Sequence, residues 1–294
     1  MTNNRSELAA RLAKPTPLLL DGATGTELER RGVRASLPLW SAHALYDAPD
    51  LLVEIHSQYV AAGADLITAN TFRTQRRCLA RAGRGDDAAH LTTLATDLAR
   101  QATAAADRRV FVLGSAPTLE DCYRPDLAPD DAALADEHAE HANHLAKAGV
   151  DAILVETMNS IREAKAAVRA ANTTALPVLV SFICGKAATL LSGETLSDAL
   201  DAIASERPAA VLVNCLPPSR VPACLRVLRT GPQPFGAYAN LGEPTGEGRS
   251  EDVSPEQFAV HASTWWSHGA RITGGCCGTT PAHIAAIASL VERA

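Results

Sequence analysis

The sequence contains few lysines and few aromatic residues. Only 4 of its 27 basic residues are lysine, 33 residues are acidic, and the net charge at pH 7 is −6. No basic stripe with interleaved aromatic side chains occurs, so we expect no nucleic-acid partner. Aromatic residues make up 4% of the chain and hydrophobic residues 47%, which predicts a large core built mainly from aliphatic residues and alanine.

Long apolar segments are also missing. No hydrophobic run approaches 18 residues, so the sequence predicts no membrane-spanning helix. Residues 1–17 lack the apolar stretch of a secretory signal. The seven cysteines, an odd number in a long chain, do not suggest a disulfide framework. We therefore expect a cytoplasmic protein whose cysteines are free thiols, metal ligands or nucleophiles.

Short β-rich runs alternate with alanine-rich stretches of helical spacing along all 294 residues. The predicted strands are 17–21, 65–70, 109–115, 151–156, 177–183, 209–215, 235–240 and 271–275. The predicted helices are 50–62, 86–106, 131–148, 161–171, 195–205, 220–229, 255–268 and 281–293. No linker divides the chain. The pattern predicts an α/β protein with one (β/α)8 TIM barrel domain over residues 1–294, and a doubly wound open sheet is the alternative.

Polar and sulfur-containing residues gather at the ends of the predicted strands. Loops at the carboxyl ends of barrel strands converge on one mouth, where barrel enzymes place their chemistry. The strand ends with such residues are Asp21-Gly22, Asn70-Thr71-Phe72, Glu156-Thr157, Asn214-Cys215, Asn240 and the run Gly274–Gly278.

The adjacent cysteines Cys276 and Cys277 are the most specific feature. Neighbouring residues of a strand point to opposite faces, so both sulfurs reach one ion only where glycines let the chain turn, and glycines flank this pair. Cys215 would approach across the mouth as a third thiolate and leave one open position, as in catalytic zinc sites. A structural site would need a fourth ligand, commonly in CxxC spacing, which this chain lacks. The alternative is three small buried hydrophobic residues.

Five segments in family order resemble the homocysteine S-methyltransferase family: Leu20–Gly32, Asn70–Phe72, Val155–Thr157, Val213–Cys215 and Gly274–Pro281. The resemblance extends from about residue 18 to the last predicted helix. It implies a zinc-dependent barrel in which Cys215, Cys276 and Cys277 hold Zn²⁺ and the thiol of homocysteine takes the open position.

The resemblance also implies roles for residues around the metal. Asp21, Gly22 and Glu156 would contact the amino acid portion of homocysteine, because two carboxylates suit an α-ammonium group. Thr71 and Phe72 are candidate pocket walls, and Asn240 would line the donor side. The alternatives are that Asp21 caps the following helix, that Glu156 pairs with Arg162 or a neighbouring arginine, and that Thr71 and Phe72 are ordinary loop residues.

These features predict an enzyme that transfers a methyl group to homocysteine and forms methionine. A free alkyl thiol with a pKa of about 8.5 is only a few per cent ionised at pH 7, and zinc removes that cost. The negative site favours a sulfonium donor, S-methylmethionine or S-adenosylmethionine. Relatives that use methyltetrahydrofolate through a corrinoid carry added domains, for which 294 residues leave no room. Betaine as donor and a selenol as acceptor remain alternatives.

Other patterns are interpreted as structural. His138, His141 and His144 recur every three residues, which predicts a solvated helix face rather than a metal site. We take Cys184, with the other cysteines outside the motifs, as a core thiol. A lyase or aldolase barrel would need a Schiff-base lysine, and Lys186 alone lies near a strand end. A non-catalytic zinc-binding barrel is the rival class, disfavoured by the two carboxylates. The oligomeric state is not indicated.

Overall fold

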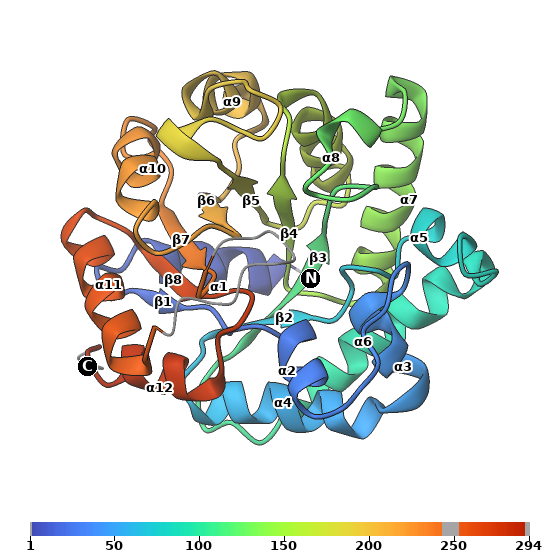
Figure 1. Ribbon diagram of the computed structural model, residues 1–294, viewed down its shortest axis with the longest axis horizontal. Coiled ribbons are helices and arrows are strands. Elements are labelled where there is room, and N and C mark those ends of the chain that lie inside the picture. The colour runs from blue at the N-terminus through green and yellow to red at the C-terminus, as the bar shows by residue number, and fades with distance from the viewer. Residues whose placement is uncertain (1, 243–252, 292–294) are drawn as a thin grey trace.

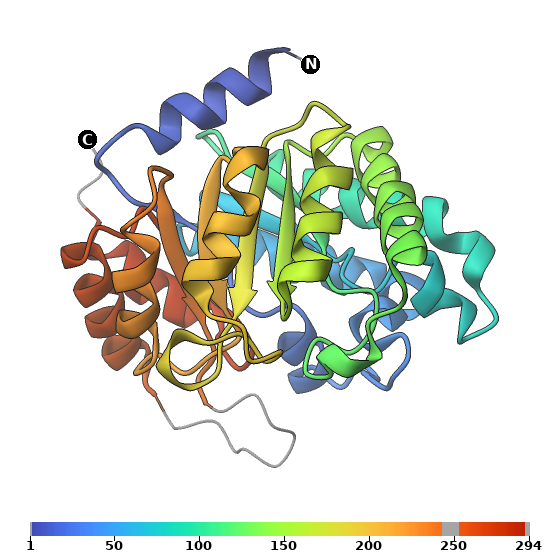
Figure 2. The same ribbon diagram turned by 90° about the horizontal axis from the view of Figure 1, so that it is seen from above.

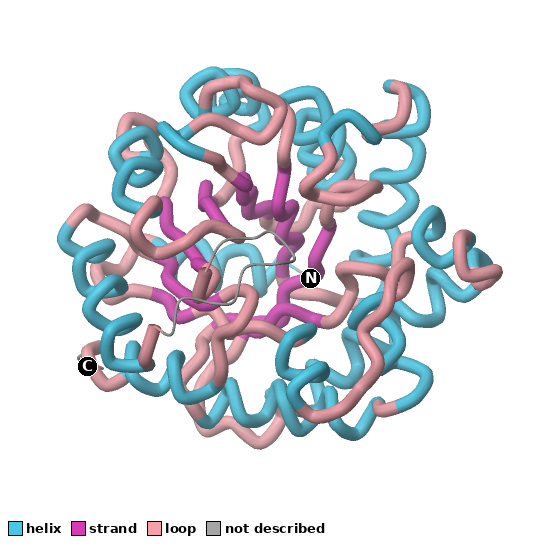
Figure 3. The backbone as a smooth tube through the Cα atoms, in the orientation of Figure 1, coloured by secondary structure: helices cyan, strands magenta, loops and turns pink. Residues whose placement is uncertain are grey.

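The computed structural model describes residues 2–242 and 253–291, and in them eight parallel strands form a barrel surrounded by helices (Figures 1 and 3). The strands are hydrogen-bonded in the order β1-β8-β7-β6-β5-β4-β3-β2, and a bridge between Leu20 and Leu66 joins β1 to β2. This arrangement confirms the TIM barrel and excludes the open sheet. The strands are β1 (Leu18–Leu19), β2 (Leu66–Ala69), β3 (Phe111–Ala116), β4 (Ala152–Met158), β5 (Val178–Ile183), β6 (Ala210–Asn214), β7 (Phe235–Ala239) and β8 (Ile272–Gly275).

The outer helices follow the predicted pattern. They are α4 (Pro49–Ala61), α6 (Ala88–Thr103), α7 (Asp131–Ala148), α8 (Ile161–Asn172), α9 (Leu196–Ile203), α10 (Val221–Leu228), α11 (Pro255–Ser267) and α12 (Pro281–Ala288). Four helices were not predicted: α1 (Thr2–Leu12), α2 (Gly25–Arg30), α3 (His43–Asp47) and α5 (Arg76–Ala80). Helix α1 lies across the end of the barrel where the strands begin (Figure 2), and Leu8 and Leu12 pack on the barrel interior. The last predicted helix, 281–293, is longer than α12, which ends at Ala288, and residues 292–293 of that prediction lie outside the described residues.

The barrel interior is built in layers. Alternate residues of a strand point to opposite faces, so one inward position is followed by another two residues later. The lower layer is apolar and contains Leu66, Leu113, Leu154, Leu179 and Leu212. Two residues further along β2 to β6, the same inward register places Thr68, Ser115, Glu156, Ser181 and Asn214. A polar layer therefore lies on an apolar floor, at the carboxyl ends of the strands.

Two aspartates close the seam between β1 and β2. The Leu19 N–H donates to the Asp65 carboxylate at 3.0 Å, and the Thr68 N–H donates to the Asp21 carboxylate at 2.8 Å. Backbone bonds from Asp65 to Leu19 and from Asp21 to Leu66 lie between them, at 2.7 and 3.0 Å. Because β1 has only two residues, side-chain acceptors extend the ladder at both ends of this seam.

The histidines of α7 correct one prediction. His138 and His141 are buried at 3% exposure, not solvated, because this face of α7 packs against α8 and β3. His138 Nε2 lies 3.3 Å from a carboxylate oxygen of Glu163, and His141 Nε2 lies 3.0 Å from the carbonyl oxygen of Ser115. Burial lowers the pKa of His141 to about 4, so this ring is neutral at physiological pH. Within residues 2–242 and 253–291, no helix is long and apolar enough to span a membrane.

Candidate active site

A cavity of about 540 Å³ opens at the carboxyl ends of the strands. Its floor is formed by buried residues of the first, fourth, sixth and seventh βα units, among them Asp21, Glu156, Cys215 and Tyr238. Its rim comes from loops and contains Leu37, Trp40, Phe72, Arg73, Asp121 and Tyr123. The cavity therefore has a buried floor with polar side chains and an entrance that contains three aromatic side chains.

Three sulfur atoms meet at one side of the floor. Cys215 follows β6, Cys276 and Cys277 follow β8, and their Sγ atoms lie within 4.8 Å of one another, with 3.1 Å between those of Cys215 and Cys276. Tetrahedral zinc with Zn–S bonds of about 2.3 Å places its sulfur ligands about 3.8 Å apart. In the described residues this is the one cluster of three or more candidate ligands. The three thiols therefore fit a metal ion with small adjustments.

Asn214 orients the first cysteine. Its Oδ1 accepts from the Ser181 hydroxyl at 2.6 Å, and its Nδ2 donates to the Thr157 hydroxyl at 2.8 Å and approaches Cys215 Sγ at 3.3 Å. Thr157 and Cys215 have φ angles of 59° and 54°, a left-handed backbone that only surrounding contacts can hold in residues other than glycine. An N–H donor on the sulfur favours the thiolate that a metal ligand must become.

The adjacent cysteines Cys276 and Cys277 are held by hydrogen bonds to the end of β7. The N–H of Cys276 donates to the carbonyl of Ala239 at 2.8 Å, and the N–H of Cys277 donates to Asn240 Oδ1 at 3.0 Å. Asn240 is 2% exposed and is not among the cavity-lining residues of the described chain. The structure thus places Asn240 as a support of the cysteine turn, whereas the sequence predicted a wall on the donor side.

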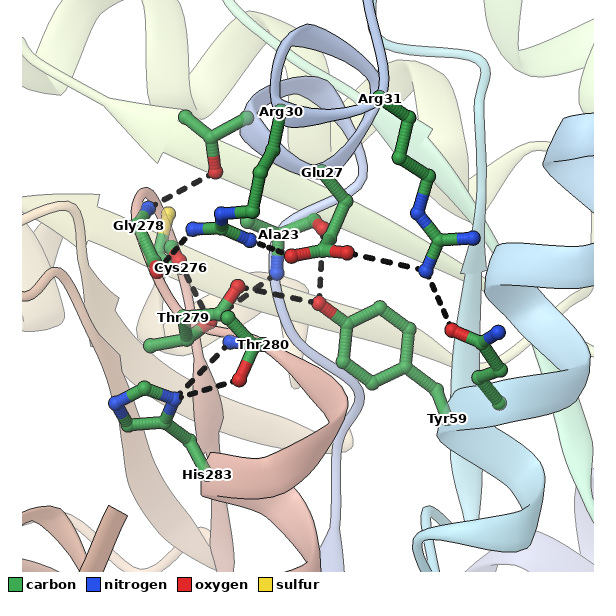
Figure 4. A network of polar contacts seen from close by, with 12 residues as sticks. Ala23, Glu27, Arg30, Arg31, Tyr59, Cys276, Gly278, Thr279, Thr280 and His283 are labelled. Atoms are coloured by element: carbon green, nitrogen blue, oxygen red, sulfur yellow. Dashed lines mark hydrogen bonds and ion pairs between the residues drawn. The ribbon is translucent and has the colours of Figure 1, made fainter. Parts of the chain in front are cut away.

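Figure 4 shows how the turn after the cysteines is fastened to the β1–α2 loop. The Thr279 hydroxyl donates to the Cys276 carbonyl at 2.7 Å and accepts from the Ala23 N–H at 3.2 Å. The Tyr59 hydroxyl, from α4, lies 2.9 Å from the Ala23 carbonyl and 3.3 Å from the Thr279 carbonyl. A Cβ on Gly22 would lie 2.7 Å from the Thr279 hydroxyl oxygen, so this contact requires glycine.

Substituting Tyr59 by phenylalanine tests this connection. The change removes the one O–H donor that the two buried carbonyls share, so the free energy of unfolding should fall by about 1–3 kcal/mol. Because the cysteine turn loses a support, metal affinity should fall by about 10- to 100-fold. Chemical denaturation and competition with a chelator measure the two effects. Tyr46→Phe is the control, since its hydroxyl bonds Asp87 outside the cavity, and it should alter stability alone. Unchanged metal affinity in Tyr59→Phe would contradict the role.

The two predicted carboxylates lie in the same cavity. Both oxygens of Asp21 accept from Thr68, and Glu156 accepts from the hydroxyls of Ser115 and Tyr238, the latter at 2.9 Å. Burial raises the pKa of Asp21 well above its ordinary value and also raises that of Glu156, and in both the hydrogen bonds offset part of the effect. A cation placed between them would favour the ionised form of both carboxylates.

The alternatives for these residues are resolved by the contacts. Arg162 pairs with Asp131 at 3.0 Å, and Asp21 bonds β2 rather than capping α2. Gly22 and Phe72 line the cavity. Thr71 is fully buried behind the wall, where its hydroxyl donates to the Ser115 carbonyl at 3.0 Å. Thr71, a predicted pocket wall, is thus not among the cavity-lining residues of the described chain.

Several cavity residues were not singled out from the sequence. Ser115, Thr68 and Tyr238 could have been found, since each lies two residues beyond an inward position of its strand. The rim residues carry no such signal, because they lie in loops without periodicity. Those rim residues are Leu37, Trp40, Arg73, Asp121, Cys122 and Tyr123.

A family profile described as homocysteine S-methyltransferase matches residues 18–291. The chain belongs to this family. Homocysteine S-methyltransferase YbgG of Bacillus subtilis is 31% identical, over 92% of this chain and 93% of that protein. Homocysteine S-methyltransferase of Escherichia coli is 33% identical, over 97% and 98%. The protein is therefore an enzyme of the methyltransferase class, and its substrates are small molecules.

The fold of this methyltransferase agrees with that of a solved relative. The crystal structure of the homocysteine methyltransferase MmuM from Escherichia coli in its metallated form has a TM-score of 0.85 and 30% identity, over 96% of this chain and 99% of that one. Carboxyl transferase domains of Rhizobium etli pyruvate carboxylase share 11–12% identity, with TM-scores of 0.54–0.56. That likeness is one of barrel fold.

The cysteines of the methyltransferase have unlike acidities. Hydrogen bonds from Cys215 and Cys276 lower the pKa of Cys277 well below its ordinary value, and hydrogen bonding with Cys276 and Cys277 raises the pKa of Cys215. The cluster thus holds one anionic sulfur readily, and the remaining protons leave only if positive charge arrives. This is the acid–base behaviour of a metal-binding thiol cluster.

Proposed function

We propose that this barrel domain transfers a methyl group from a sulfonium amino acid, S-methylmethionine or S-adenosylmethionine, to the thiol of homocysteine. The carrying observation is the joint placement of three sulfurs and two buried carboxylates in one cavity. Asp21 and Glu156 would bind the α-ammonium group of homocysteine, and Gly22, which lines the same cavity, would contact the amino acid portion. The thiol then points toward the cysteine cluster.

Cys215, Cys276 and Cys277 would hold Zn²⁺ in this proposal. When bound, zinc supplies a Lewis acid that keeps the acceptor thiol ionised near pH 7. The chain's own contribution is positioning, because methyl transfer needs an in-line approach of the thiol and no proton transfer to the methyl group. One C–S bond of the sulfonium breaks, a C–S bond to homocysteine forms, and one proton is released per turnover.

The aromatic rim supports a sulfonium donor. Trp40 and Phe72 pack edge to face with ring centroids 5.9 Å apart, and Tyr123 lines the same cavity. Aromatic faces attract cations, and a sulfonium loses its charge on transfer, so the product leaves such a site more easily than the substrate. A relative named selenocysteine Se-methyltransferase from Brassica oleracea, 28% identical, keeps a selenol acceptor as an alternative for the same cavity.

The number of methionine molecules formed per turnover tests which methyl donor the enzyme uses. We expect S-methylmethionine with homocysteine to give two methionines per turnover, S-adenosylmethionine to give one methionine and S-adenosylhomocysteine, and betaine to give none. Zinc content is measured on the same protein by atomic emission, with about one ion expected per chain. Methionine from betaine alone would overturn the sulfonium proposal. Absence of methionine with every donor, in zinc-loaded protein, would overturn the methyl-transfer proposal itself.

A further inference from the structure

One cationic side chain lines the active-site cavity. Among the cavity-lining residues in the described part of the chain, Arg73 is the sole lysine, arginine or histidine. Its Nε is buried and has no hydrogen-bond partner. A guanidinium has further N–H donors besides Nε, and these can bind a ligand. Arg73 therefore brings the one positive charge of this lining to a cavity whose other charged groups are acidic.

Contacts hold this guanidinium at the rim. Its central carbon lies 5.4 Å from the centroid of the Phe72 ring, which is itself braced by Trp40. It also neighbours Cys78 and Cys122: burial raises the pKa of both thiols, and the charge of Arg73 offsets part of that rise. A guanidinium next to an aromatic ring keeps its fork of N–H donors for a carboxylate. The contact with Phe72 restricts the conformations of the Arg73 side chain.

Asp121 supplies the opposite charge on the same rim. One of its carboxylate oxygens accepts the Tyr123 N–H at 2.9 Å, which fixes the β3–α7 loop against the cavity. Within residues 2–242 and 253–291, neither Asp121 nor Arg73 forms an ion pair with another side chain. The rim thus presents one positive and one negative group that do not neutralise each other directly.

We propose that Arg73 and Asp121 bind the α-amino acid group of the methyl donor, Arg73 its carboxylate and Asp121 its ammonium. The inference rests on the proposed function, in which Asp21 and Glu156 on the floor already bind the acceptor's ammonium. The donor is a zwitterion and needs one cationic and one anionic partner, and the rim supplies both in Arg73 and Asp121. The pair selects sulfonium amino acids over betaine, which has no N–H group to donate to Asp121.

Two analogues of S-methylmethionine isolate the contacts. 3-Aminopropyl-dimethylsulfonium lacks the carboxylate, and 4-dimethylsulfoniobutanoate lacks the ammonium. With Arg73→Met, KM for S-methylmethionine should rise roughly 10- to 100-fold, the effect of losing a charged hydrogen bond. KM for the decarboxylated analogue should be the same in Arg73→Met as in the wild type, because this analogue has no carboxylate for Arg73 to bind. In Asp121→Asn, KM for the deaminated analogue should equal that of the wild type, because this analogue has no ammonium group for Asp121 to bind. KM for S-methylmethionine should rise in the same variant.

KM for homocysteine should stay within about twofold of wild type in both variants, and isothermal titration should show the same selectivity without turnover. Arg76→Ala is the control for charge, because Arg76 is exposed on α5, pairs with Glu140 and does not line the cavity. Thermal melting confirms that each variant is folded, and Arg73→Lys should recover part of the donor affinity. A rise in KM for homocysteine instead would assign Arg73 to the acceptor and overturn the proposal. Failure of the wild-type enzyme with every sulfonium would overturn the proposed function instead.

Discussion

Replacing Cys277 by serine should remove the metal and lower kcat/KM for homocysteine by at least about 10³-fold. Lewis-acid activation is worth several kcal/mol, and each 1.4 kcal/mol is a factor of ten. Hydrogen bonds from Cys215 and Cys276 lower the pKa of Cys277, so its substitution removes a sulfur that is readily available as a thiolate ligand. Metal content per chain and single-turnover methyl transfer measure the two effects together.

Cys224 provides the matched control for that substitution. It is buried in α10 and is not among the residues of the cavity, so Cys224→Ala should retain the metal and the rate. Full metal content together with full activity in Cys277→Ser would show that the three sulfurs do not form the metal site. Loss of metal in both variants would point to a change of fold instead.

Asp21→Asn should weaken homocysteine binding by about 100-fold or more and yet stabilise the fold above neutral pH. The acceptor's ammonium loses a buried carboxylate partner, a change that costs about 3–5 kcal/mol. Burial raises the pKa of Asp21 in the folded chain above its unfolded value, so the folded state binds the extra proton. Stability contributed by this group is therefore lost as the pH rises through the folded pKa, and asparagine avoids that loss.

Denaturant titrations at several pH values measure the effect. The stability gain of Asp21→Asn should be present at pH 8 and absent below the ordinary aspartate value of about 3.9, where both states are protonated. Asp65→Asn is the control: it closes the other end of the same seam but does not line the active-site cavity, so KM for homocysteine should not change. A stability gain at acid pH alone would contradict the assigned pKa direction.

The barrel could be predicted because the strand and helix patterns alternate eight times along the sequence. Strands β2 to β6 each place a leucine inward and a valine or isoleucine outward, and Cys215 and Cys276 stand directly after a strand. Short helices such as α3 and α5, of five residues each, hold too few turns to show a period. The rim residue Arg73 depends on how a loop folds back over the mouth, which no local pattern encodes.

The predicted solvent exposure of the α7 histidines was wrong for a related reason. Their spacing describes one helix face correctly, but which face meets the barrel depends on the neighbouring helix. Glu163 of α8, buried at 1% exposure, bonds His138 and so draws that polar face inward. A histidine next to a buried acid and a histidine in water look alike in sequence.

Asp21 joins two processes that are usually separate, because the carboxylate proposed to receive homocysteine also holds β2 against β1. Any fluctuation that parts the two strands also withdraws the carboxylate from the ligand, and any ligand that keeps Asp21 ionised and in place resists that fluctuation. Ligand occupancy and closure of the cylinder are thus thermodynamically coupled through one side chain. The amides of β1 and β2 report this coupling directly, since their hydrogen exchange slows when the ring is kept shut.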